Sequence, residues 1–339
     1  MRKSLLVIAL PTMALVLVVA SLAIAPGILK GLSQGPPATS VSAPAWNVGD
    51  RWTYNVSLTS MGENEILPVT MMPVATVSNE SFVVGTLTET VVSSVSTPSG
   101  EAWNVTLDGS FGFESPPAIL STEPTVQSLS MPAVKTSGFV WLRQSDLAPI
   151  YSLKAVHLDR NWTLWDGLSG WYGMLANTTY SLSYDATTQV WYAPPLAIWQ
   201  FPLEENASWN ASSNATIHYA SAFRILGPNV TYEADHFANF TIPVDVAMHT
   251  GFFENVTTPA GTFRALPAWA SHGLRFGEIP DRDASAMMNL TGEMDFEMPR
   301  SFATAWFSAQ AGNVVRADFG TGFLDGPRVE LDLVSYTFS

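Results

Sequence analysis

Few residues in this 339-residue chain have the types and spacing that catalysis or metal binding requires. The five histidines show neither H-x-x-x-H nor H-x-H spacing, so only the fold could bring metal ligands together: His157, His218, His236, His249 and His272. Residues 31–35 read G-L-S-Q-G and match the G-x-S-x-G nucleophile elbow. An elbow needs a strand before it and a helix after it, whereas this match lies between an apolar run and a Pro-Pro pair. We therefore predict no catalytic residue, no metal and no cofactor.

Acidic residues form three local groups. Glu233, Asp235 and His236 could make a proton-transfer or metal cluster, although acids beside a histidine in a loop are usually just solvated. The other two groups, Asp281/Asp283 and Glu293/Asp295/Glu297, lack the spacing and terminal glutamate of an EF-hand loop. A charged strand face is the better interpretation of both.

Aromatic residues are concentrated between residues 139 and 199. This stretch holds six of the 12 tryptophans and two tyrosines that we take as candidate ligand-binding residues: Trp141, Trp162, Trp165, Trp171, Tyr172, Trp191, Tyr192 and Trp199. Large rings mostly fill protein cores. The alternative is a cleft that binds a lipid or a glycan by ring stacking and apolar contact.

Residues 4–29 form an uncharged apolar run that organises the rest of the chain. As a helix it would measure about 39 Å, more than the ~30 Å hydrocarbon core of a bilayer. Arg2 and Lys3 precede the run, which favours a cytoplasmic amino terminus and an extracellular location for the bulk of the chain. A cleaved signal peptide ending at Ala25 is the alternative, but Pro26 is a poor cleavage context and the run exceeds a usual signal core. We predict an uncleaved single-pass anchor in the cell membrane.

N-x-S/T sequons are the strongest statistical signal in the chain. They begin at twelve of the 15 asparagines, where chance would give about three: Asn55, Asn79, Asn104, Asn161, Asn177, Asn206, Asn210, Asn214, Asn229, Asn239, Asn255 and Asn289. In a strand, the Asn and the Ser or Thr of a sequon share one face and the middle residue points to the other. Several middle residues are large and apolar, so we expect glycans outside and core inside.

The remaining composition narrows the classes of protein. A net charge of −14 with few lysines makes nucleic acid an unsuitable partner. Without cysteine there are no disulfides, so an ordinary hydrophobic core must stabilise the exported part.

Beyond a Gly/Pro/Ser-rich linker at residues 31–45, the sequence predicts an all-β fold with little helix. Seven segments read as strands: 50–58, 81–95, 139–142, 215–225, 262–268, 313–319 and 329–338. Short helices are predicted at 165–176 and at 284–290, the latter capped by Asp283. We expect antiparallel sheets, arranged as a sandwich or a curved open barrel.

Two segments look like copies of one strand opening. Residues 48–52 (V-G-D-R-W) correspond to residues 205–209 (E-N-A-S-W), with Asn206 in the place of Gly49. Both residue types readily adopt positive φ. The repeat divides the chain after the anchor (1–30) and the linker into β-rich units at 46–200 and 201–339.

Residues 254–263 (E-N-V-T-T-P-A-G-T-F) read as a β-hairpin. Pro259 presets a type I turn, and Gly261 can adopt the positive φ that closes a three-residue loop with a bulge.

With the opening at 46–54 (W-N-V-G-D-R-W-T-Y), this hairpin and the segment 306–316 (W-F-S-A-Q-A-G-N-V-V-R), the chain resembles a broad set of uncharacterised exported bacterial and archaeal proteins. The resemblance covers mostly the carboxy-terminal half and implies an antiparallel β fold anchored outside the cell. Its motifs look structural and bring no catalytic residues. The sequons and the anchor suggest an archaeal surface glycoprotein.

Three functions remain open. The first is a structural or interaction glycoprotein that is not an enzyme and contacts another surface protein. The second is a binding module that uses the tryptophan-rich stretch 139–199 for a lipid or a glycan. The third is a glycosidase-like hydrolase, which would need two carboxyls about 5 to 10 Å apart in a cleft.

Overall fold

The computed structural model describes residues 40–59, 75–76, 81–112, 118–119, 134–163, 179–228, 230–274, 302–320 and 328–339. These residues form only strands and their connections. The strands are β1 (Ser40–Val41), β2 (Arg51–Thr59), β3 (Ala75–Thr76), β4 (Ser81–Thr97), β5 (Gly100–Gly112), β6 (Ala118–Ile119), β7 (Val134–Arg143), β8 (Pro149–Thr163), β9 (Thr179–Ala193), β10 (Leu203–Glu204), β11 (Ser208–Gly227), β12 (Val230–Thr250), β13 (Glu254–Thr258), β14 (Gly261–Leu274), β15 (Phe302–Ser308), β16 (Asn313–Gly320) and β17 (Arg328–Thr337).

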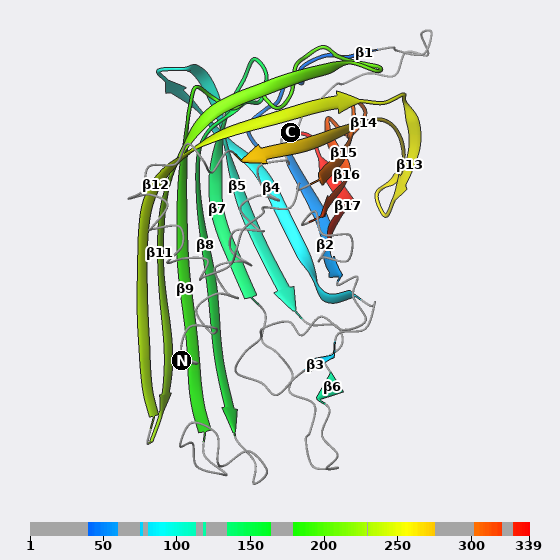
Figure 1. Cartoon of the computed structure of the whole chain (residues 1–339). Helices are drawn as coiled ribbons and strands as arrows, with labels where there is room; N and C mark the ends of the chain where they lie inside the picture. Colours follow the sequence, from blue (N-terminus) through cyan, green and yellow to red (C-terminus); the bar gives the residue numbers. More distant parts are fainter. Residues whose placement is uncertain are drawn as a thin grey trace.

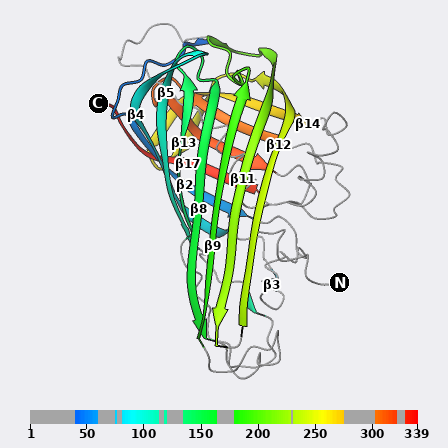
Figure 2. The ribbon, with the colours of Figure 1, turned by 90° about the vertical axis from the view of Figure 1, so that its left-hand side faces the viewer.

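One antiparallel sheet contains nearly all of these strands. Its order is β12-β11-β9-β8-β7-β5-β4-β2-β17-β16-β15-β14-β13, and a further ladder between β12 and β14 closes twelve of the strands into a barrel. Figure 1 shows the sheet curving round from the long strands β8, β9, β11 and β12 to the shorter β15, β16 and β17, and Figure 2 shows the short strands crossing behind the long ones. The antiparallel all-β class is confirmed, and the sheet is closed rather than a sandwich or an open barrel.

Alternation along the strands separates the core from the outer surface. In β11 every second residue from Ala211 to Ile225 is buried, and the residues between them are largely exposed. The sequon rule follows the same alternation, because the apolar middle residues Val56, Val105, Phe240 and Val256 are all buried. Closing the sheet therefore places one face of each strand in a shared hydrophobic core.

The two predicted copies of one opening have the same backbone hydrogen bonds. Gly49 (φ 102°) donates its N–H to the Val91 carbonyl, and Val91 donates back to Asp50. Asn206 (φ 55°) donates to Gly251, and Thr250 donates back to Ala207. Both openings lead into a strand of the barrel, which confirms that Asn206 takes the positive φ of Gly49.

The sequence motifs at the two ends of the chain meet inside the barrel. Trp52 Nε1 donates to the Ala311 carbonyl at 2.9 Å, and the Tyr54 hydroxyl donates to the Val314 carbonyl at 3.1 Å. Both rings are fully buried. Since buried Trp and Tyr need partners for their polar atoms, these bonds tie β2 to the residues at the start of β16.

The predicted hairpin is present between β13 and β14. Thr258 pairs with Gly261, whose φ is 135°, and Pro259-Ala260 form a two-residue loop rather than the three-residue loop predicted. The Ala260 N–H donates to the Leu333 carbonyl at 3.0 Å. The turn is thereby fixed against β17.

Each of the seven predicted strand segments coincides with a strand to within one residue at its ends or lies inside one: β2, β4, β7, β11, β14, β16 or β17. The two predicted helices, the linker up to residue 39 and the apolar run 4–29 lie outside the described residues. Within the described residues, no helix has the length and apolar character needed to cross a membrane. Both proposed β-rich units contribute to the one sheet, since β9 pairs with β11 across the boundary. The division near residue 200 remains a prediction.

Candidate functional site

The candidate aromatic residues do not gather in one cleft. Trp141 and Trp191 lie on the outer face of the sheet, where Trp191 is 39% exposed. Tyr192 points into the barrel, and Trp199 is buried against Phe307 with ring centroids 5.6 Å apart. The other candidate side chains lie outside the described residues: Trp162, Trp165, Trp171 and Tyr172. The tryptophan-rich stretch thus supplies both core and surface.

The outward-facing rings form a continuous cluster across three strands. We call this cluster the outer aromatic patch. It consists of Phe139 and Trp141 of β7, Tyr151 of β8 and Trp191 of β9. The ring centroids of Trp141 and Tyr151 are 5.1 Å apart, and those of Tyr151 and Trp191 are 4.6 Å apart. His218 of β11 extends the patch, with its ring 5.1 Å from Trp191. Sequence reasoning missed Tyr151 and His218, because only strand register places them beside the tryptophans.

Three sequons surround the outer aromatic patch. Asn104 of β5 pairs directly with Trp141, and Asn239 of β12 pairs with His218. Asn214 of β11 lies two residues before Thr216, which pairs with Trp191. Paired residues of an antiparallel sheet share a face. The patch therefore lies between asparagines that could carry glycans.

Most described sequon asparagines are exposed. Seven of the eight whose burial the structure describes are open to solvent: Asn55, Asn161, Asn206, Asn210, Asn214, Asn239 and Asn255. Asn104 is the exception, because it is half-buried and its Oδ1 is buried without a hydrogen-bond partner. The candidates Asn79, Asn177, Asn229 and Asn289 lie outside the described residues.

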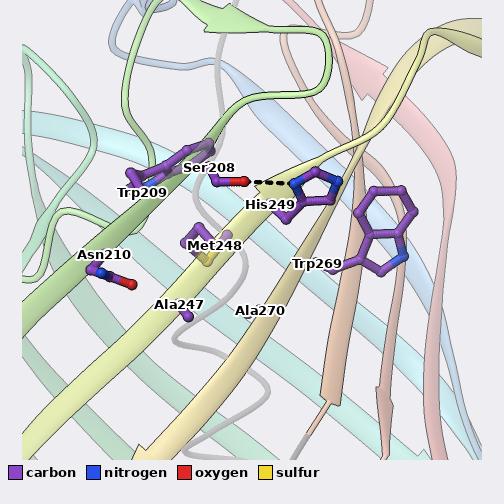
Figure 3. A pocket seen from close by; sticks show the side chains of 8 residues that line it. All are labelled: Ser208, Trp209, Asn210, Ala247, Met248, His249, Trp269 and Ala270. Atoms are coloured by element: carbon purple, nitrogen blue, oxygen red, sulfur yellow. Dashed lines mark hydrogen bonds between the residues drawn. The ribbon is translucent and has the colours of Figure 1, made fainter.

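A second surface feature is a cavity of about 550 Å³ at the ends of β11, β12 and β14. Ser208 Oγ and His249 Nδ1 lie 2.8 Å apart in it, and the His249 ring stacks on Trp269 at 5.4 Å and 19° (Figure 3). In the described part of the chain, no carboxylate bonds the other His249 nitrogen, so the Ser–His pair lacks the third member of a hydrolytic triad. This arrangement can donate and accept hydrogen bonds beside an aromatic face.

His157 on the outer face of β8 contacts two carboxylates. Its Nδ1 lies 2.6 Å from Asp185 Oδ1, and its Nε2 lies 2.9 Å from Asp159 Oδ2. The hydrogen bond to Asp185 and the nearby negative charges raise the pKa of His157. All three side chains are well exposed, so the cluster lies on an open strand face and not in a cleft.

The barrel interior holds a pair of titratable residues, Glu89 and Lys154. Burial raises the pKa of Glu89 to about 8 and lowers the pKa of Lys154 to about 7, and each charge acts on the other residue. Asn313 Nδ2 lies 3.5 Å from Glu89 Oε2. Perturbed pKa values often mark functional sites, but both side chains are at least 92% buried and a ligand in solvent does not reach them.

The Glu233/Asp235/His236 group is not assembled into a metal site. Glu233 and Asp235 are exposed on β12, and the intervening alternation turns His236 to the opposite face. These residues lie in a strand and not in the loop we expected. Asp281, Asp283, Glu293, Asp295 and Glu297 lie outside the described residues. Among the described residues, no group of three or more His, Asp or Glu side chains could hold a metal ion.

Comparisons with known proteins add two distant structural neighbours. One is a protein inferred to be exported, with a YmcC-like fold, from Bacteroides fragilis: it is 10% identical, with a TM-score of 0.29. The other is a protein inferred to be a lipoprotein from Parabacteroides distasonis, which is 11% identical with a TM-score of 0.31. Each match covers 88% of this chain and 99% of the neighbour. No protein family and no curated protein matches the sequence. Both TM-scores are too low for either neighbour to bear on function.

Proposed function

We propose that this chain is a membrane-anchored extracytoplasmic glycoprotein with an interaction role and without catalytic activity. The observation that carries the proposal is the exposure of the sequon asparagines. Seven of eight described ones are open to solvent, while the middle residues of five of these sequons lie in the core: Val56, Ala211, Ala215, Phe240 and Val256. An asparagine in this position can carry a glycan without disturbing the barrel.

The test uses the protein purified from its native source. Glycopeptide mass spectrometry should find modified asparagines at several sequons, and Asn47 and Asn313, which lie outside sequons, should be unmodified. Thr257→Ala should abolish modification of Asn255, whereas Thr257→Ser should preserve it. A mass equal to that of the bare chain would refute the glycoprotein.

The anchor has a separate test. Amino-terminal sequencing of the native protein should begin before Pro26, and the protein should remain in the membrane fraction after a high-salt wash. A sequence that began at Pro26 or later would show a cleaved leader instead.

A second function, recognition of an external glycan, is favoured by the outer aromatic patch. Trp141 and Trp191 pack against the 9%-exposed Tyr151 ring on the outer face, and the exposed faces of such rings are suitable surfaces for sugars. Trp191→Ala should abolish retention on immobilised glycans without loss of folding, because Trp191 is 39% exposed. The control Trp199→Ala should impair folding, since Trp199 is buried. Unchanged retention of Trp191→Ala, or equal retention on lipid vesicles, would argue against this role.

The glycosidase alternative has no comparable support. Two carboxylates flank His157 on an open strand face. Asp159 is 64% exposed and Asp185 is 61% exposed. Glycoside hydrolysis needs its two carboxyls to flank a bound sugar in a cleft.

A further inference from the structure

We propose that the outer aromatic patch is covered by the protein's own N-linked glycan, attached to Asn104. The first sugars would lie over Trp141 and Trp191, which pack on either side of the 9%-exposed Tyr151 ring, rather than extend into solvent. This inference rests on the proposed glycosylation of the chain, and it replaces the external glycan of the second function with the chain's own glycan as the occupant of the patch.

Strand register supplies the first argument. Asn104 pairs with Trp141, Trp141 with Tyr151, and Tyr151 with Trp191, so the four side chains form one row across β5, β7, β8 and β9. Directly paired side chains are separated by about 5 Å at Cβ. Adjacent strands lie about 4.8 Å apart, so the three rings span about 10 Å, the length of a short oligosaccharide.

The side chain of Asn104 supplies the second argument. It is the half-buried asparagine among the eight described sequon positions, and its Oδ1 is buried without a partner. A glycan on the amide nitrogen of this half-buried residue would start beside its paired residue Trp141, whereas a glycan on an exposed asparagine starts in solvent.

The chemistry of the patch suits a sugar. Aromatic rings carry negative charge on their faces, and the C–H bonds of a pyranose are polarised in the opposite sense. Beyond Trp191 the row continues to the hydroxyls of Thr216 and Thr241, which lie 3.0 Å apart and can bond sugar hydroxyls. Covering the rings with sugar also removes apolar surface from water.

Asn214 provides a matched comparison. Its sequon lies on the same outer face, but its paired neighbours are Ala193 and Pro243, which have no aromatic ring. A glycan on Asn214 therefore has no aromatic surface directly opposite it.

The experiment measures oxidation of Trp191 by N-bromosuccinimide in protein produced in the native host. Trp269 is the internal control, because it is 41% exposed and belongs to the separate cavity. In wild type, Trp191 should oxidise several-fold more slowly than Trp269. Asn104→Gln and Thr106→Val, which both remove the sequon, should bring the two rates close together. Asn214→Gln and the sequon-preserving Thr106→Ser should leave the wild-type difference unchanged.

Glycopeptide mapping of the same samples separates the possible failures. If no sequon is occupied, the proposed glycoprotein itself is wrong. If other sequons are occupied but Asn104 is bare, or if Asn104 is occupied while Trp191 oxidises as fast as Trp269, the glycoprotein stands and the covering of the patch is refuted. Thr106→Val keeps the asparagine, so it tests the proposal even where Asn104→Gln fails to fold.

Discussion

Individual residues at unusual backbone angles fix the turns of this barrel. Gly261 has φ 135°, and no heavy atom lies within 4 Å of the position its Cβ would occupy. A side chain at residue 261 would therefore meet no steric clash, and the positive φ is the reason that glycine is required there. Asn206 at φ 55° shows that a side chain is tolerated where its own geometry permits a left-handed turn.

Gly261→Val should destabilise the protein by roughly 1 to 3 kcal/mol, because a β-branched residue is strained at positive φ. Denaturant unfolding measures the change. Thr257→Ser on the same hairpin is the control, since Thr257 is an exposed strand residue and serine keeps both the sequon of Asn255 and a hydroxyl for Thr262. Equal midpoints for Gly261→Val and wild type would contradict the turn.

His157 should make stability depend on pH. Its folded pKa is raised above the ordinary value, so its contribution is fully present below that value and is lost as the pH rises through the folded pKa. His157→Gln should therefore lower the melting temperature more at pH 5 than at pH 9. The effect is small because the ring is 48% exposed, and added salt should shrink it. A larger loss at pH 9 would reverse the assignment.

At the scale of elements, the barrel is held by contacts between strands distant in sequence. Trp52 and Tyr54 of β2 bond the backbone at the start of β16, and the Asp50 carboxylate accepts the Ser339 N–H at 2.9 Å. Inside the barrel, Glu89 of β4 and Lys154 of β8 interact electrostatically. The alternation of apolar and polar residues sets which side of each strand is buried. These contacts between distant strands then decide which strands face one another across the core.

The Glu89–Lys154 pair predicts a non-additive mutant cycle. Lys154→Met should cost about 1 to 3 kcal/mol at neutral pH, because burial raises the pKa of Glu89 to about 8 and its mostly protonated carboxyl then stays buried without its polar neighbour. The double variant Glu89→Gln/Lys154→Met should cost less than the sum of the single variants, with a coupling energy of about 1 to 3 kcal/mol. Unfolding free energies of the four proteins measure this coupling. Additive losses would mean that the two side chains do not interact.

On the scale of the whole molecule, the closed sheet joins the two halves of the chain at two places. β9 pairs with β11, and β17 pairs with β2, while the β12–β14 ladder lies within the second half. Neither half closes a sheet alone. The described strands should therefore unfold together, although the sequence divides them near residue 200.

Leu107→Ala in β5 tests this cooperativity. Leu107 is 5% exposed, so the truncation should cost about 2 to 5 kcal/mol through lost burial and a cavity. The same loss should appear in the hydrogen-exchange protection of slowly exchanging amides in β11 and β14. Asp108→Ala, at the exposed neighbouring position, should change neither. Protection that falls only in β2 to β9 would show that the halves unfold separately.

Features that depend on a few neighbouring residues were determined by the sequence alone. Strand alternation placed Val56 and Phe240 in the core and their sequon asparagines outside, and the Pro-Ala-Gly run specified the hairpin. Features that depend on register were decided only by the tertiary structure. A shift of one residue would reverse the face of every side chain in a strand. Sequence could therefore not separate the buried Trp199 from the exposed Trp191, nor bring Tyr151 and Asn104 beside Trp141, because these relations arise from pairing between strands and from closure of the sheet.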